Sequence, residues 1–149
     1  MSRWSNSKNY TISVIDKKKY SILKKRNRNK KIKFFKSIND INNQNNFDYI
    51  IFAIRPLELT NVFKELKNTN FNKKTIVISV IAGKKTEIFK KNLLNISKIV
   101  RVMPNMPALI GEGVHCIYTN KSINKKEIKE IDKLFSLSGK TLFLIVKLL

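Results

Sequence analysis

One short segment of the sequence combines residue types that can shape a ligand site. Residues 101–108 read Arg-Val-Met-Pro-Asn-Met-Pro-Ala, and a Gly-Glu-Gly turn follows at residues 111–113. Each proline fixes its own backbone torsion, and the glycines permit a tight turn before the next apolar stretch. The pattern predicts a rigid loop at the carboxyl end of a strand, with the polar Asn105 between the two prolines. Open α/β sheets bind their ligands at such strand ends.

Two earlier turns occupy the same position relative to an apolar run. The run that begins at Tyr49 ends in Ala-Ile-Arg-Pro at residues 53–56, where the proline presets the first turn of a helix. The next run ends in Val-Ile-Ala-Gly at residues 80–83, whose small residues let a ligand approach the backbone. Side by side, the two turns would form one edge of a cleft. The alternative is that each turn simply connects a strand to a helix.

Charged residues follow the first apolar run. Residues 10–15 lead into Asp16, where dinucleotide-binding folds often place a carboxylate that binds the adenosine ribose. Lys17 and Lys18 come next and could hold a ribose 2′-phosphate, which favours NADP over NAD. The alternative for Asp16 is a role as the cap of the helix that follows.

Apolar, β-branched runs recur along the chain and predict strands at residues 10–15, 32–35, 49–54, 75–81, 99–103, 114–118 and 141–146. Apolar residues at helical spacing lie between several of these runs, at Leu57, Val62, Phe63, Leu66, Ile88, Phe89, Leu93, Ile128, Ile131, Leu134 and Phe135. Alternating strands and helices predict an α/β domain of Rossmann-like, doubly wound type with a mostly parallel sheet. The runs at 49–54 and 75–81 are almost continuously apolar, which predicts neighbouring, central strands covered on both faces.

Together these segments resemble pyrroline-5-carboxylate reductase. That family carries an Arg-x-Met-Pro-Asn-x-Pro-Ala segment, preceded by an Ala-x-Lys-Pro turn and a Ser-x-x-Ala-Gly turn. This sequence has all three in the same order and at similar spacing, at residues 101–108, 53–56 and 79–83. The resemblance extends from Tyr10 to residues 134–140, which match a Phe-x-x-x-Gly pattern before the last strand of the family's nucleotide-binding domain.

The resemblance implies an oxidoreductase that reduces 1-pyrroline-5-carboxylate to L-proline with NADPH, in the last step of proline biosynthesis, with NAD as the alternative cofactor. The turn at residues 53–56 would line the pyrophosphate and nicotinamide, residues 80–82 would contact the nicotinamide, and Asp40 would lie near the adenosine ribose. Together with Lys17, the implied cofactor-binding residues are Asp40, Ala53, Ile54, Arg55, Pro56, Val80, Ile81 and Ala82. The loop on the substrate side would contain Met103, Pro104 and Asn105. Full-length members of the family form homo-oligomers.

The sequence also departs from the family pattern. Arg55 replaces the usual lysine, which keeps the charge but changes its geometry. No Gly-x-Gly-x-x-Gly precedes the strand at Tyr10, so the phosphate-binding loop and the first strand of the fold are missing from this sequence. We therefore expect residues 1–149 to be a truncated NAD(P)-binding domain without the helical dimerisation domain. We also expect this polypeptide to be inactive by itself.

No residue is assigned a catalytic or metal-binding role. His115 is the only histidine and Cys116 the only cysteine. A structural role for His115 and a buried, inert thiol at Cys116 are the interpretations that we favour. Hydride transfer to an imine needs no protein nucleophile, because the cofactor carries the chemistry.

The formal net charge of +21 raises the alternative of a small basic module that binds nucleic acid. The lysines are spread along the chain without interleaved aromatic residues, and they accompany many Asn and Ile residues, which also have AT-rich codons. This pattern favours a biased composition, so nucleic acid is not expected as a partner. Another dehydrogenase of the same fold, of the prephenate or hydroxyacid type, is the second alternative, but it is not expected to carry residues 103–108 in this form.

The sequence has no apolar run long enough to span a membrane and no secretory signal in its first ten residues. A single cysteine gives no support to an oxidising compartment. A cytoplasmic location without membrane contact is therefore expected.

Overall fold

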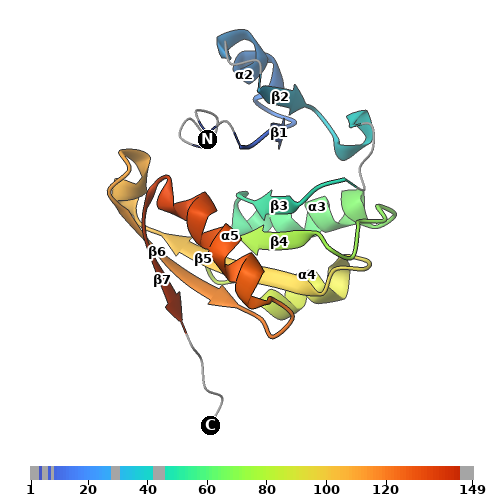
Figure 1. The fold of residues 1–149 in the computed structure, drawn as a ribbon. Helices are drawn as coiled ribbons and strands as arrows, with labels where there is room; N and C mark the ends of the chain where they lie inside the picture. Colours follow the sequence, from blue (N-terminus) through green and yellow to red (C-terminus); the bar gives the residue numbers. More distant parts are fainter. Residues whose placement is uncertain (1–3, 5–6, 8, 28–30, 42–45, 145–149) are drawn as a thin grey trace. The chain divides into compact units, whose positions relative to one another are not determined.

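The computed structural model describes residues 4, 7, 9–27, 31–41 and 46–144. The chain divides into two compact units, Met1–Gln44 and Asn45–Leu149, and each is described by itself. Element labels follow Figure 1. The strands expected at residues 10–15 and 32–35 belong to the first unit, and the other five belong to the second.

The first unit is a single βαβ arrangement. Strand β1 (Ile12–Ile15) and strand β2 (Ile32–Phe35) are parallel, and helix α2 (Tyr20–Arg26) connects them. Ile12 pairs with Ile32 at one end of this two-stranded sheet, and Ile15 pairs with Phe35 at the other. A 3-10 helix, η1 (Ile38–Asp40), follows β2.

The second unit contains a five-stranded sheet in the order β3-β4-β5-β6-β7. The strands are β3 (Tyr49–Phe52), β4 (Ile76–Ser79), β5 (Lys98–Pro104), β6 (Gly113–Thr119) and β7 (Gly139–Leu144). Neighbouring strands are parallel, except that β6 runs antiparallel to β5. The prediction of a mostly parallel α/β sheet is therefore confirmed, and so is the pairing of the strands at Tyr49 and Ile76.

Helices cover both faces of this sheet (Figure 1). Helix α3 (Leu59–Leu66) and helix α4 (Thr86–Asn92) pack on the face that we call the α4 face. There the ring of Phe52 contacts the rings of Phe63 and Phe89, with centroids 6.1 and 5.1 Å away. Helix α5 (Lys125–Ser136) packs on the opposite face, which we call the α5 face. Apolar residues of α3 and α5 recur at the spacing that predicted them.

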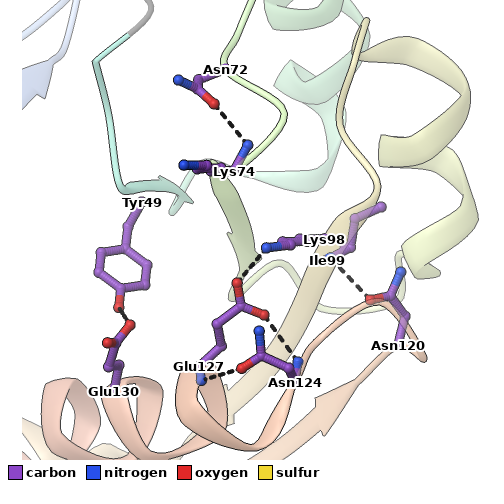
Figure 2. A network of polar contacts seen from close by, with 9 residues as sticks. All are labelled: Tyr49, Asn72, Lys74, Lys98, Ile99, Asn120, Asn124, Glu127 and Glu130. Carbon is purple, nitrogen blue, oxygen red and sulfur yellow. Dashed lines mark hydrogen bonds and ion pairs between the residues drawn. The ribbon is translucent and has the colours of Figure 1, made fainter.

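Polar contacts attach α5 to its face of the sheet (Figure 2). Asn124 begins the helix with a capping box, in which its side chain and that of Glu127 bind each other's backbone amide groups. Glu127 also forms an ion pair with Lys98 of β5, and Tyr49 of β3 donates a 3.5 Å hydrogen bond to Glu130. The side chains of one helix therefore bind two different strands.

One expectation about the sheet is wrong. Strand β4 is buried along its whole length, as a central strand should be. Strand β3 was expected to be central as well, but it is the outer strand of its sheet and only Phe52 is fully buried. In the doubly wound order 3-2-1-4-5-6, β2 and β1 correspond to strands 3 and 2, and β3, β4 and β5 to strands 4, 5 and 6. Within the described residues no strand corresponds to strand 1, and β3 is an edge strand of its sheet.

Candidate functional site

The three turns singled out in the sequence lie at one edge of the five-stranded sheet. Strands β3, β4 and β5 are adjacent and parallel, so their carboxyl ends point the same way. Strand β6 runs back from this edge and β7 starts beside it, with Gly113 paired to Gly139. We call this the strand-end edge. The topology therefore places residues 53–56, 80–83 and 103–105 along one border, as a cleft at strand ends requires.

The first turn presents a cation whose position is fixed by a neighbour. Ala53, Arg55 and Pro56 are exposed, and Pro56 opens the 3-10 helix η2 (Pro56–Glu58). The guanidinium group of Arg55 forms a 2.9 Å ion pair with Glu58, while its side chain stays 74% exposed. A guanidinium group has five N–H donors, so one carboxylate leaves others available for an anionic ligand. The sequence reading missed Glu58, although the three-residue spacing from Arg55 could have suggested the pair.

The second turn has one buried side chain, that of Ile81, followed by the exposed residues Ala82 and Gly83. Ile81 is only 2% exposed, so a ligand at this turn would meet its backbone and not its side chain. The side-chain oxygen of Ser79 accepts a 3.3 Å hydrogen bond from the Ile81 amide group. Ala82 and Gly83 are exposed, and Gly83 adopts a left-handed φ of 70° with no atom within 4 Å of the place of a Cβ. The turn therefore offers an unobstructed surface of small residues.

The third segment is held in one shape by its own contacts. The side-chain oxygen of Asn105 accepts a 2.9 Å hydrogen bond from the amide group of Val114. A Cβ on Gly113 would lie 2.6 Å from Ala108, so only glycine fits where the 3-10 helix η3 (Met106–Leu109) returns to β6. Because the oxygen of Asn105 is used in this way, its NH₂ group is the part left to bind a ligand. Met103, Pro104 and Asn105 are all exposed.

A buried histidine lies next to this segment. His115 of β6 pairs with Pro104 of β5, is 2% exposed and packs against the ring of Phe135. Its Nε2 atom lies 3.0 Å from the hydroxyl oxygen of Ser138, which also donates to the Phe135 carbonyl at 3.1 Å. Burial lowers the pKa of His115, and hydrogen bonding to the backbone of Ser138 opposes this effect only in part. A buried, neutral side chain agrees with a structural role.

The remaining predicted residues, Lys17 and Asp40, belong to the first unit. The carboxylate of Asp16 accepts hydrogen bonds of 3.0 and 2.8 Å from the amide groups of Lys18 and Lys19 in the turn before α2. It does not cap the helix itself, whose N-cap residue is Lys19 without a side-chain cap. Asp40 accepts a 3.0 Å hydrogen bond from the Ser37 amide group in a capping box. The two segments follow the carboxyl ends of the adjacent parallel strands β1 and β2, so they share one edge of the small sheet.

The same edge carries a basic cluster that the sequence reading missed. The ammonium groups of Lys24 and Lys36 lie 5.4 and 5.5 Å from the centre of the Tyr20 ring. Lys36 directly follows β2, just as Lys17 comes soon after β1. A search for cations immediately after each strand would have found it. The first unit thus joins an aromatic ring and several lysines at the end of a βαβ arrangement.

Two further observations concern the described part of the chain alone. It contains no group of three or more side chains that could hold a metal ion. None of its helices is both long and apolar enough to cross a membrane.

Comparison with known proteins shows which proteins the chain resembles. A scan against protein-family models finds no match. The chain is 35% identical over 100 residues to a pyrroline-5-carboxylate reductase of Aquifex aeolicus. The match covers 67% of this chain and 36% of that protein. The chain therefore spans about a third of the length of these curated relatives.

Solved structures show the same fold. The crystal structure of Plasmodium falciparum pyrroline carboxylate reductase with NADP bound has a TM-score of 0.69 and 19% identity, and the match covers 94% of this chain and 59% of that one. A prephenate dehydrogenase of Aquifex aeolicus with NAD+ also has a TM-score of 0.69, with 14% identity over 95% of this chain and 53% of that one. At these identities the structures establish the fold alone, whereas the sequence similarity is to pyrroline-5-carboxylate reductases. The chain is therefore similar over part of its length to the pyrroline-5-carboxylate reductases, an oxidoreductase family, and it has the fold of NAD(P)-dependent dehydrogenases.

Proposed function

We propose that this region is the cofactor-binding part of an enzyme that reduces 1-pyrroline-5-carboxylate to L-proline with NADPH, the last step of proline biosynthesis. The observation that carries the proposal is the shared strand-end edge. Three turns that resemble motifs of one family follow three adjacent parallel strands and lie along a single border of the sheet. Cofactors bind at this border in open α/β sheets.

The residues at the edge fit a dinucleotide. Ala82 and Gly83 present a small, exposed surface to the flat nicotinamide ring, and Val80 and the Ile81 backbone border it. Arg55 provides a cation for the pyrophosphate, together with the backbone of Ala53, Ile54 and Pro56. When bound, NADPH supplies the hydride. The protein's contribution is to hold the nicotinamide and the imine carbon in contact and to exclude water from between them.

Asn105 would orient the substrate end of the cleft. Because its oxygen is bound to the Val114 amide group, its NH₂ group donates. Such a donor suits the carboxylate of an imino acid or the carboxamide oxygen of the nicotinamide. Met103 and Pro104 supply apolar contacts beside it. Met103 is 39% exposed, so its surface is accessible to a ligand.

In the first unit, Lys17 and Asp40 would contact the adenosine half of the cofactor. The capping role of Asp40 fixes its backbone next to the end of β2, and Lys36 lies beside the Tyr20 ring in the same segment. Several cations at this edge favour the 2′-phosphate of NADPH over the ribose hydroxyl of NADH. We therefore propose NADP as the main cofactor.

The 149-residue polypeptide alone is proposed to be inactive. Its sequence contains no Gly-x-Gly-x-x-Gly, and without that loop the pyrophosphate lacks a row of backbone amide donors. We also propose that longer chains of the family contain a helical dimerisation domain and form homo-oligomers. A cytoplasmic location stays a prediction from the sequence.

The test compares the purified polypeptide with a chimaera in which residues 9–144 replace the corresponding region of the Aquifex aeolicus reductase. NADPH oxidation with 1-pyrroline-5-carboxylate should be absent from the polypeptide and present in the chimaera. Full turnover by the 149 residues would refute the proposed inactivity. A folded chimaera that oxidises NADPH with a different substrate, but not with this imino acid, would refute the proposed function.

A further inference from the structure

The side chain of Tyr20 contacts two lysines of the first unit in different ways. Tyr20 opens α2, and Lys24 lies about one helical turn later. The ammonium group of Lys24 donates a 3.0 Å hydrogen bond to the hydroxyl oxygen of Tyr20. The ammonium group of Lys36, which directly follows β2, lies over the ring itself, 5.5 Å from its centre. One aromatic side chain therefore contacts a cation of its own helix and a cation of the segment after β2.

The contact with Tyr20 restricts the position of Lys36. Lys36 is exposed, whereas Tyr20 is half-buried. A lysine side chain in water samples many rotamers, and a ligand that binds it must restrict them at a cost in free energy. The attraction between an ammonium group and the face of an aromatic ring reduces this cost, because the group is already confined before the ligand arrives. An ammonium group has three N–H donors, so contact with one ring face leaves donors for an anion.

The acidic residues of the same edge are bound by the backbone. Asp16 and Asp40 are the only acidic residues between positions 9 and 41. Each carboxylate accepts two hydrogen bonds of 2.8 to 3.2 Å from nearby backbone amide groups. These hydrogen bonds fix the carboxylates within their own turns, while Tyr20 holds the two lysines. The edge therefore offers a confined cation to an anionic ligand.

We propose that Tyr20 is a positioning residue for the choice of cofactor, because it holds Lys36 where the 2′-phosphate of NADPH binds. This inference rests on the proposed function, in which the adenosine half of the cofactor lies at the carboxyl ends of β1 and β2. A phosphate monoester accepts charge-assisted hydrogen bonds from an ammonium group, whereas the ribose hydroxyl of NADH gains little from a fixed cation. Lys24 adds a second positive charge at the same ring.

The test uses two probes that differ only in this phosphate group. Adenosine 2′,5′-bisphosphate and adenosine 5′-monophosphate are titrated into the 149-residue polypeptide, and the ratio of their dissociation constants measures the preference for the 2′-phosphate. The bisphosphate should bind at least about tenfold more tightly. Tyr20→Met should reduce this ratio about threefold, because methionine suits a helix but provides no ring. Tyr20→Phe should keep the ratio within about twofold, because the ring remains.

A double-mutant cycle separates positioning from general stabilisation of the first unit. Lys36→Gln should reduce the ratio about fivefold, and Tyr20→Met combined with Lys36→Gln should reduce it no further than Lys36→Gln alone. Lys33→Gln is the matched control, because this exposed lysine lies within β2 and should leave the ratio unchanged. If Tyr20→Met does not fold, Lys36→Gln and Tyr20→Phe still test the site. In the chimaera, Tyr20→Met should raise KM for NADPH about threefold and leave kcat and KM for NADH unchanged.

Three outcomes would overturn the proposal. The first is the absence of any preference of the wild-type polypeptide for the bisphosphate, including the case in which neither probe binds. The second is a loss in Tyr20→Phe as large as that in Tyr20→Met, and the third is independent, multiplying losses in the double variant. A chimaera without activity on 1-pyrroline-5-carboxylate would instead count against the proposed function, and the titrations of the two probes would still decide the role of Tyr20.

Discussion

The side-chain oxygen of Asn105 lies 2.9 Å from the backbone nitrogen of Val114 and accepts its hydrogen bond. This contact joins the end of β5 to the second residue of β6, across the loop that contains η3. Because the oxygen of Asn105 is bound to Val114, the NH₂ group is the half of the side-chain amide that faces away from the loop. A residue found through its sequence motif therefore has an orientation that only the fold reveals.

Replacing Asn105 with Asp should impair turnover in the chimaera far more than stability. The aspartate still accepts the Val114 hydrogen bond, but it loses the NH₂ donor and adds a negative charge next to an anionic substrate. We expect kcat/KM to fall at least about a hundredfold, as it does when a single oriented donor is lost. Steady-state kinetics and urea denaturation of the same variant measure the two effects. Asn105→Ala is the control, because it also loses the anchor and should lower stability as well.

Two glycines should respond differently to alanine. At Gly113 a Cβ would lie 2.6 Å from Ala108, so Gly113→Ala forces a backbone shift and should cost about 2–3 kcal/mol of unfolding free energy. At Gly83 the space is open and only the left-handed φ of 70° opposes alanine, at a cost of about 1–2 kcal/mol. Denaturant titrations of both variants test this order. Equal losses would mean that the loop around Ala108 adjusts without strain.

Much of this fold could be predicted from the sequence because its strands are short, apolar and β-branched. All seven appear, and the continuous run at residues 75–81 contains the fully buried β4. The edge position of β3 does not show in its own residues, which have the composition of a strand covered on both sides. It arises because no described strand takes the place of strand 1 beside it. Helix α2 was not predicted as a segment, since its lysines leave little apolar periodicity. The antiparallel return of β6, which brings Val114 to Asn105, is likewise a property of the tertiary fold.

The ion pair between Lys98 and Glu127 should stabilise the second unit measurably. Their side chains are only 21% and 12% exposed, so the charges are largely removed from water. Burial raises the pKa of Glu127, but the hydrogen bond and charge of Lys98 and the Asn124 amide group outweigh it, and the pKa is lowered. Lys98→Met leaves this carboxylate without its cation and should cost about 1–3 kcal/mol. Lys129 is an exposed lysine of α5, the helix that contains Glu127, and Lys129→Met should change the free energy of unfolding by less than about 0.5 kcal/mol.

Stability should also depend on the protonation of His115. Its pKa is lowered in the fold, so below its ordinary value of about 6.5 the unfolded chain binds more protons than the folded one. The contribution of neutral His115 is therefore complete above about pH 6.5 and is lost as the pH falls below it, by at most about 1.4 kcal/mol per pH unit. Because His115 is the only histidine, His115→Gln should flatten the profile of unfolding free energy below about pH 6.5. An unchanged slope in this variant would assign the effect to other groups.

The last prediction concerns the choice between NADPH and NADH. Lys17 comes soon after β1 and Lys36 directly after β2, so both lie at the carboxyl edge of the two-stranded sheet, and Lys36 also lies 5.5 Å from the Tyr20 ring. A phosphate monoester near these cations gains charge-assisted hydrogen bonds that a ribose hydroxyl cannot make. In the chimaera, replacing both lysines with Gln should raise KM for NADPH about tenfold and leave KM for NADH within about twofold. Lys33→Gln provides the matched control, because this exposed lysine lies within β2, away from the edge, and should change neither constant. A parallel rise in both KM values would show that the lysines stabilise the first unit without recognising the phosphate.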